Sequence, residues 1–250
     1  MRRMMLTLLA LGLTAYGQPA TSTPSSVRFA NYLSASVLPS AEVGTAIKSI
    51  KLNGKIVSKN LKYGEYTPYL HLPSRTVTVE VDVGKSQPII RTIRHVPAGE
   101  GTAYVSGNPA GVFVSIYSDK PPFIFKDTGR AYFRFINLYN YSTYKDGAFI
   151  STSLERPCLS SEPSSPVPLT RVSYLGRPVT ASYALSDQSP SRRGGEYWLL
   201  AGPDARPDAA SSSTFCVAVN EEDVLGKLTT VLLVYNGFTN EGGRIVIVKD

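Results

Sequence analysis

The chain has few of the residues from which metal centres are built. Its 250 residues include two cysteines, two histidines and one tryptophan. Two cysteines are too few for a structural zinc site, and His71 and His95 are far apart in the sequence. No Asp-rich loop has the spacing of a calcium-binding site. We therefore expect no metal site and no cofactor.

The usual motifs of catalytic centres are also missing. The Gly-x-Ser-x-Gly elbow of serine hydrolases does not occur, so any imidazole base would have to be His71 or His95. His71 lies in an alternating run, where a solvent-facing strand residue is the ordinary interpretation, and His95 is typical of a surface group at a strand end. The acidic run 221–223 is typical of a solvated turn. We therefore expect no catalytic residue and no enzymatic activity.

Long apolar runs are rare, and the one at the N-terminus is short. Residues 4–13 are mainly apolar, follow an arginine pair, and precede small residues that end at Gly17. A membrane-spanning helix needs roughly 20 apolar residues, whereas this arrangement is typical of a signal peptide. We expect a signal peptide over residues 1–17, with cleavage after Ala20 and a buried N-terminal strand as alternatives. The mature chain should have no membrane span and should reside in the periplasm, or alternatively outside the cell or on its surface.

Acidic residues are in the minority, which limits the classes of partner. Lysine and arginine total 26 against 19 aspartates and glutamates, a formal net charge of +7. The charges are dispersed, and Arg192-Arg193 is the only adjacent basic pair beyond the expected signal peptide. We therefore expect no nucleic-acid partner. A modest basic excess can hold a protein near acidic polysaccharide or anionic lipid, although it is equally ordinary on an inert surface.

The two cysteines, Cys158 and Cys216, both lie in the C-terminal half. In an oxidising compartment such a pair most simply forms one disulfide. This bridge would close a loop of roughly 60 residues and stabilise the fold by roughly 4 kcal/mol on the chain-entropy estimate. Two buried thiols are the alternative.

Apolar residues recur mainly at every second position. Val77, Val79, Val81 and Val83 alternate with polar residues, and residues 112–116 repeat the pattern. Such alternation is typical of strands with one packed and one wet face. Asn53-Gly54, between two apolar segments, favours a tight hairpin turn. No long run has helical spacing, so we expect an all-β protein.

Three segments of the first half recur in the same order in the second half. An apolar-Arg-Phe-x-Asn segment at 27–31 matches 133–137, residues 50–57 match 172–179, and residues 65–72 have a fainter match in 196–200. Several ordered matches indicate a duplicated unit. The sequence therefore predicts two tandem antiparallel β-sandwich domains after the signal peptide.

Serine and proline mark the expected boundaries. We expect a flexible lead at 18–26, the first domain at 27–118, a linker at 119–129 and the second domain at 130–250. Phe123 and Phe125 in the linker suggest that the domains touch. A Ser/Pro-rich stretch at 154–169 lengthens the second copy, and we expect it to be a surface loop anchored by the disulfide of Cys158.

Aromatic residues are abundant, with 15 tyrosines and 9 phenylalanines. Strand alternation assigns Phe133 and Phe135 to a core. The candidate contacts to a sugar ring or a partner protein are Tyr139, Tyr141, Tyr144 and Trp198, because tyrosine and tryptophan anchor interfaces well. The alternative is that these tyrosines cover the edge of the sandwich.

The repeated Arg-Phe strands, joined across Pro121-Pro122-Phe123, resemble the AlgF family. The resemblance extends to the layout of the mature chain, and its most specific part is that proline segment followed by residues 133–138. AlgF proteins are periplasmic factors needed for alginate O-acetylation, built of two β-domains and not thought to carry the catalytic triad. The resemblance implies O-acetyltransferase proteins and an acidic polysaccharide as partners. Cys158 and Cys216 are not part of that family's pattern, and no interface residue is carried over.

The first domain alone, through residues 61–65 and 69–73, also resembles a β-sandwich repeat of bacterial surface proteins. Our leading hypothesis is a non-catalytic periplasmic accessory protein in the O-acetylation of an alginate-like exopolysaccharide. The alternative is a secreted or cell-surface β-sandwich module that binds glycan or a surface protein. A hydrolase that uses His71 or His95 is the third hypothesis.

Overall fold

The computed structural model describes most of the chain from Ser25 onwards. The described residues are 25–33, 46–84, 89–108, 111–120, 129–139, 147–153, 167–184, 196–202, 215–235 and 243–248. The expected signal peptide (1–17) and residues 121–128 of the expected linker lie outside them, so these two predictions stay predictions.

The first half consists of strands, as the alternating pattern predicts. They are β1 (Ser25–Leu33), β2 (Ala46–Leu52), β3 (Lys55–Lys62), β4 (Leu70–Leu72), β5 (Thr76–Asp82), β6 (Ile90–His95), β7 (Gly99–Asn108) and β8 (Gly111–Ser118). Val77, Val79 and Val81 of β5 are buried. Asn53 and Gly54 have φ values of 50° and 80° and join β2 to β3, which is the turn expected for this dipeptide.

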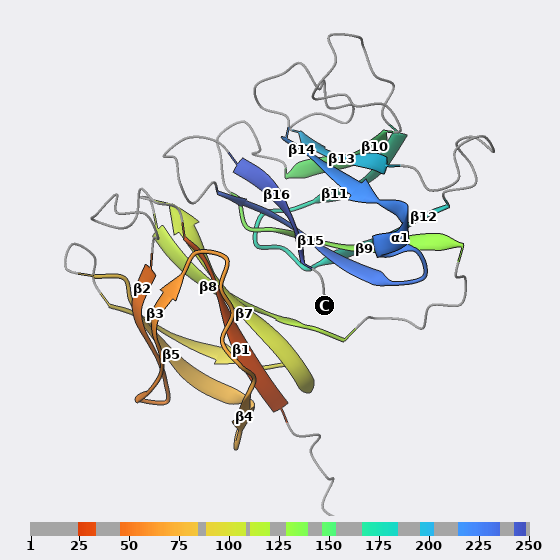
Figure 1. Cartoon of the computed structure of the whole chain (residues 1–250). Coiled ribbons are helices and arrows are strands. Elements are labelled where there is room, and N and C mark those ends of the chain that lie inside the picture. Colours follow the sequence, from red (N-terminus) through yellow and green to blue (C-terminus); the bar gives the residue numbers. More distant parts are fainter. Residues whose placement is uncertain are drawn as a thin grey trace, which may run out of the picture.

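The second half also consists of strands, with one short helix. Its elements are β9 (Arg130–Asn137), β10 (Ala148–Ser153), β11 (Val167–Val172), β12 (Val179–Ala184), β13 (Glu196–Gly202), β14 (Phe215–Asn220), α1 (Glu221–Val224), β15 (Leu228–Tyr235) and β16 (Gly243–Val248). Figure 1 shows the first half in red to yellow-green and the second half in green to blue.

Each half forms two sheets whose strand order is the same in both copies. The described strands of the first half form the sheets β4-β1-β7-β8 and β3-β2-β5-β6, and those of the second half form β12-β9-β15-β16 and β11-β10-β13-β14. Each strand of the second half thus takes the place of the strand eight numbers earlier. The two sheets of each half enclose a common apolar core. The predicted all-β fold with two sandwiches is confirmed.

One strand pair in each half is parallel, in contrast to the other pairs. β1 runs parallel to β7, and β9 runs parallel to β15. The repeated Arg-Phe-x-Asn motif lies on these equivalent strands. Asn31 Nδ2 donates to the Leu61 carbonyl, and Asn137 Nδ2 donates to the Val172 carbonyl. In each half the motif asparagine therefore ties one sheet of the sandwich to the other.

The other two sequence matches do not join equivalent elements. Residues 50–57 form the β2–β3 hairpin, whereas residues 172–179 span the end of β11 and the start of β12. Residues 65–72 lead into β4, whose counterpart is β12, whereas 196–200 lie in β13. The duplication is real, but only its first match aligns the two copies. Short apolar-polar strands resemble one another too closely for the other matches to be informative.

The start of the first sandwich also differs from the prediction. Ser25 and Ser26, assigned to the flexible lead, belong to β1 and are buried. They pair with β4 on one side and β7 on the other. The strand begins before its first apolar residue, because backbone pairing with β4 and β7 determines its N-terminal end.

The two halves pack against each other through a third apolar cluster. We call β4-β1-β7-β8 and β12-β9-β15-β16 the inner sheets and the other two the outer sheets. The cluster contains Ala30, Tyr32, Tyr104, Ile136, Leu138, Leu232 and Val234, all of them buried. These residues come from both inner sheets, so the sheets form four layers with the inner pair in the middle (Figure 1). Phe123 and Phe125, from which the contact was predicted, lie outside the described residues.

Candidate functional site

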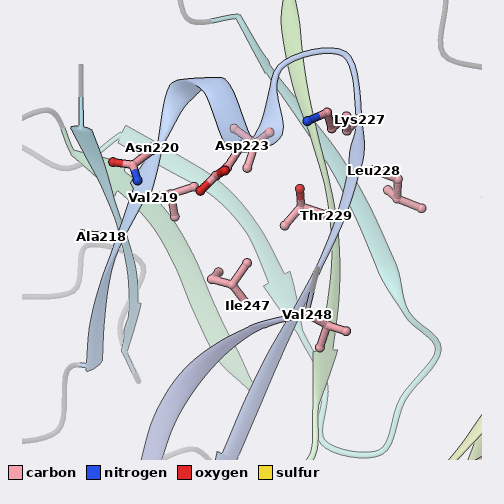
Figure 2. A pocket seen from close by; sticks show the side chains of 10 residues that line it. Ala218, Val219, Asn220, Asp223, Lys227, Leu228, Thr229, Ile247 and Val248 are labelled. Carbon is pink, nitrogen blue, oxygen red and sulfur yellow. The ribbon is translucent and has the colours of Figure 1, made fainter. Parts of the chain in front are cut away.

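A pocket lies at one end of the second sandwich, where β14, α1, β15 and β16 meet (Figure 2). Its volume is about 560 Å³. The lining residues include Val219, Asn220, Asp223, Lys227, Thr229 and Ile247. A volume of this order is typical of small-molecule sites.

A difference between the two copies explains why the pocket is in the second half. The connection from β6 to β7 comprises residues 96–98, whereas the equivalent connection from β14 to β15 comprises residues 221–227 and includes α1. Val96 is buried in the first core and Val224 in the second. The longer connection supplies an equivalent buried valine and, in addition, the polar residues Asp223 and Lys227, which line the pocket.

The pocket combines polar groups with an apolar surface. Asp223 and Lys227 are exposed and lie on the α1 side of the pocket, whereas Ile247 lies on the β16 side (Figure 2). Thr229, on β15, is largely buried. A carboxylate, an ammonium and a hydroxyl therefore face a common space next to apolar side chains. This arrangement is chemically suited to a ligand that carries several hydroxyl groups on a partly apolar frame.

A second polar cluster lies on the first inner sheet. Ser26 Oγ and His71 Nδ1 share a hydrogen bond of 2.9 Å, and these residues are direct cross-strand partners in β1 and β4. The carboxylate of Asp119 accepts hydrogen bonds from Thr102 Oγ1 and from Tyr69 Oη, the latter at 2.8 Å. Burial, and next the hydrogen bond to Asp119, raise the pKa of Tyr69 above its ordinary value.

This cluster does not have the arrangement of a serine hydrolase triad. Such a triad needs an acid bonded to the imidazole nitrogen that faces away from the serine. Asp119 instead binds Thr102, Tyr69 and the guanidinium of Arg134. His71 is exposed, as expected, and its contact with Ser26 joins two neighbouring strands. His95 is likewise exposed at the end of β6.

The structure changes the interpretation of the predicted contact residues. Tyr139 is only 2% exposed and packs edge-on against Phe215 in the second core, with ring centroids 5.4 Å apart. The prediction that Tyr139 contacts a ligand is therefore wrong. Its backbone N–H donates a hydrogen bond of 2.9 Å to Oδ1 of Asn137. Tyr141 and Tyr144 lie outside the described residues.

Trp198 is half-buried in β13 and does not line the pocket. Its indole Nε1 is buried and makes no hydrogen bond within the described part of the chain. Its cross-strand neighbour in β14 is Ala218, which does line the pocket. Trp198 therefore lies next to a pocket residue in the sheet but does not itself line the pocket.

Cys216 lies in β14 and is not a free thiol, because it is disulfide-bonded. Its expected partner Cys158 lies outside the described residues, so the Cys158–Cys216 pairing stays a prediction.

Within the described ranges, no group of three or more metal-ligating side chains comes together. No helix in the same ranges is long and apolar enough to cross a membrane.

Sequence reasoning missed the pocket residues. The acidic run 221–223, for which the sequence predicts a solvated turn, forms most of α1 and places Asp223 at the pocket. The available signal was the length of this connection, which becomes visible only when the two copies are aligned strand by strand. Lys227 and Thr229 stand in no motif.

Comparisons with known proteins give only distant likenesses. No protein-family profile and no curated protein matches the chain. A carbohydrate-binding module of family CBM26 from Eubacterium rectale Amy13K, solved with maltoheptaose, is 7% identical with a TM-score of 0.24, over 91% of this chain and 97% of that one. A leucine-rich repeat protein from Bacteroides thetaiotaomicron is 14% identical with a TM-score of 0.19, over 84% of this chain and 26% of that one. TM-scores this low do not establish a common fold.

Proposed function

We propose that this protein is a non-catalytic binding protein that holds a saccharide unit in the pocket between β14, α1, β15 and β16. The observation that carries the proposal is the combination of Asp223, Lys227 and Thr229 with an apolar wall at Ile247. Sugar hydroxyls donate to a carboxylate and accept from an ammonium or hydroxyl. The C–H faces of a sugar ring pack on aliphatic side chains.

The ligand proposed is a unit of an acidic polysaccharide. Lys227 pairs with the carboxylate of a uronic acid, and Asp223 accepts from its ring hydroxyls. Loss of Arg2 and Arg3 with the expected signal peptide lowers the net charge from +7 to +5, which still favours the approach of an anionic polymer over long distances. The apolar cluster between the two halves would keep this pocket close to the first sandwich.

The role proposed for this binding is that of a periplasmic accessory protein in exopolysaccharide O-acetylation. It rests on the resemblance to the AlgF family at residues 121–123 and 133–138. In this role the protein brings an acidic polymer to O-acetyltransferase partners and supplies no nucleophile itself. The alternative role is that of a secreted or cell-surface module with the same saccharide site.

Isothermal titration calorimetry tests the binding site. An alginate oligosaccharide and a neutral glucan of the same length are titrated into the mature protein. Replacing Asp223 or Lys227 with alanine should weaken alginate binding about tenfold, because each change removes a charge-assisted hydrogen bond. Glu222→Ala is the matched control, since Glu222 is an exposed neighbour in α1 that does not line the pocket.

The outcomes test the saccharide site and the accessory role separately. Failure of both oligosaccharides to bind would refute a saccharide site. Binding of the neutral glucan alone would keep the site but refute the acidic ligand. Deletion of the gene tests the accessory role, which predicts a secreted polymer without acetyl groups. A fully acetylated polymer in the deletion strain would leave only the binding-module role.

A further inference from the structure

The first outer sheet turns one face away from the rest of the molecule. Its strands β2, β3 and β5 lie at the left of Figure 1, on the side opposite the second half. Val79 and Val81 of β5 pack into the core, so Glu80, which lies between them in the strand, points outward. Lys51 of β2 is the cross-strand partner of Glu80 and therefore lies on the same outward face.

The strand register defines the rest of this face. Its other members are Ile56, Lys59 and Lys62 on β3 and Arg91 and Ile93 on β6. We call these residues, together with Lys51 and Glu80, the basic face. The four strands of the sheet contain seven lysines and arginines against two acidic residues, an excess of five positive charges. This excess equals the net charge of +5 expected for the whole mature chain.

The two acidic residues of the sheet are already neutralised by neighbouring cations. Glu80 pairs with Arg91 at 2.6 Å and with Lys51 at 3.5 Å, and Asp82 pairs with Lys48 at 3.1 Å. The side chain of Glu80 is 11% exposed and that of Asp82 is 19% exposed. These carboxylates are therefore covered by their own partners, and they present little negative charge to solvent.

β3 supplies charges that are still available to a partner. Lys55, Lys59 and Lys62 are exposed, and none of them forms an ion pair with another described residue. β3 lies at an edge of the sheet, where lysines also discourage pairing with further strands. Because this protection would explain the lysines alone, the other side chains of the face decide what it binds.

Those other side chains provide exposed aliphatic surface. Ile56 is 51% exposed and Ile93 is 67% exposed, and Ile89, just before β6, is 54% exposed. In the described part of the chain, Phe113 is the one other large apolar side chain that is exposed. The four strands contain no phenylalanine, tyrosine or tryptophan, so the face has no ring on which a sugar could stack. Isoleucines beside lysines match the boundary between acyl chains and anionic headgroups.

We propose that the basic face binds the surface of a bilayer that contains anionic lipid. Lys59 and Lys62 bind lipid phosphates, and Ile56 and Ile93 enter the boundary between headgroups and acyl chains. The second sandwich lies at the other end of the four layers, so a bound bilayer leaves the pocket accessible. This interaction needs no saccharide and does not rest on the proposed function.

Co-sedimentation of the mature protein with vesicles tests the proposal. The probes are vesicles of phosphatidylcholine with and without phosphatidylglycerol. The protein should bind the vesicles that contain phosphatidylglycerol, and added salt should weaken this binding because it screens the charges. Lys59→Gln combined with Lys62→Gln should weaken binding at least about tenfold, since each lysine near an anionic surface contributes roughly fivefold.

Two further double variants complete the test. Lys120→Gln combined with Arg177→Gln removes the same charge at exposed positions outside this sheet, and this control should bind as the wild type does. Ile56→Ser combined with Ile93→Ser leaves the charge unchanged and should weaken binding at least about threefold, because membrane affinity scales with the buried apolar area.

The outcomes distinguish this face from the saccharide pocket. Absence of binding to the phosphatidylglycerol vesicles, or equal losses in the lysine variant and its control, would overturn the proposal. Binding of alginate in place of vesicles, lost with Lys59 and Lys62, would also overturn it and assign the face to polysaccharide. Asp223→Ala should leave vesicle binding unchanged, so a failure of the saccharide site would not be mistaken for a failure of this face.

Discussion

Arg134 in β9 and Asp119, just beyond β8, join the two sandwiches, with Nη2 and Oδ1 3.7 Å apart. The side chain of Arg134 is 4% exposed and that of Asp119 is 11% exposed. Arg134 also donates to Thr230 Oγ1 on the neighbouring strand β15 and to the Ser118 carbonyl. The equivalent arginine of the first half, Arg28, donates to Thr102 Oγ1 on β7. The duplicated motif thus supplies one arginine that has become part of the contact between the halves.

Replacing Arg134 with methionine should destabilise the protein by about 3 kcal/mol. The change leaves the buried carboxylate of Asp119 without its guanidinium partner, and breaking a buried ion pair costs roughly this amount. Chemical denaturation measures the effect. Arg130→Met on the same strand is the control, with a change within about 0.5 kcal/mol. An effect of Arg134→Met no larger than that of the control would show that this ion pair does not join the halves.

Alkaline conditions should open the contact between the halves. Burial, and next the neighbouring Tyr66, raise the pKa of Tyr32 far above its ordinary value of 10.0. Burial also raises the pKa of Tyr104 and of Tyr117. Because the folded-state pKa values are raised, this contribution to stability is complete below pH 10 and is lost as the pH rises above it.

Ultraviolet absorbance of the phenolate and circular dichroism measure the alkaline transition. Part of the tyrosine ionisation should coincide with unfolding, and Tyr32→Phe should make stability fall less steeply above pH 10. Complete ionisation of all tyrosines in the folded protein would contradict the buried contact.

Glu80 should contribute to stability at neutral pH and lose this contribution in acid. The hydrogen bond from Arg91 is the main cause of its lowered pKa, burial opposes the shift, and the charges of Arg91 and Lys51 add to it. A lowered folded-state pKa gives stability above the ordinary value of 4.5 that disappears as the pH falls below it. Glu80→Gln should therefore be less stable than the wild type at pH 7, and the difference should vanish in acid. Glu222→Gln, at an exposed position of α1, is the control.

The cysteines should be protected from alkylating reagents until a reductant is added. The predicted Cys158–Cys216 bridge would stabilise the fold by roughly 4 kcal/mol on the chain-entropy estimate. Cys158→Ser and Cys216→Ser should lose about the same stability, since either change removes the same bond. Peptide mapping under non-reducing conditions identifies the pair. A cross-link between two chains, instead of within one, would contradict the pairing.

The sequence predicted the fold well where one local rule decides the structure. Alternation placed Val77, Val79 and Val81 in the core, and Asn53-Gly54 defined a hairpin turn. The parallel pairing of β1 with β7 was not predicted, because strand alternation is the same in parallel and antiparallel pairs. The burial of Tyr139 could not be predicted from alternation, because Tyr139 lies just beyond the end of β9 and its ring packs against Phe215 of β14.

The candidate site could not be predicted from a motif. Its residues come from β14, α1, β15 and β16, and they meet because the second copy has a longer connection than the first. Asp223 and Lys227 are ordinary surface residues by sequence. Only the closure of the two sheets around Val224 gives them a common space.

An NMR titration of the ¹⁵N-labelled mature protein with an alginate oligosaccharide tests the central claim most directly. The account predicts saturable shifts for the amides of residues 218–229 and 247–248, while amides of the first sandwich stay unchanged. Shifts confined to the first sandwich, or none up to millimolar ligand, would contradict a saccharide site in this pocket.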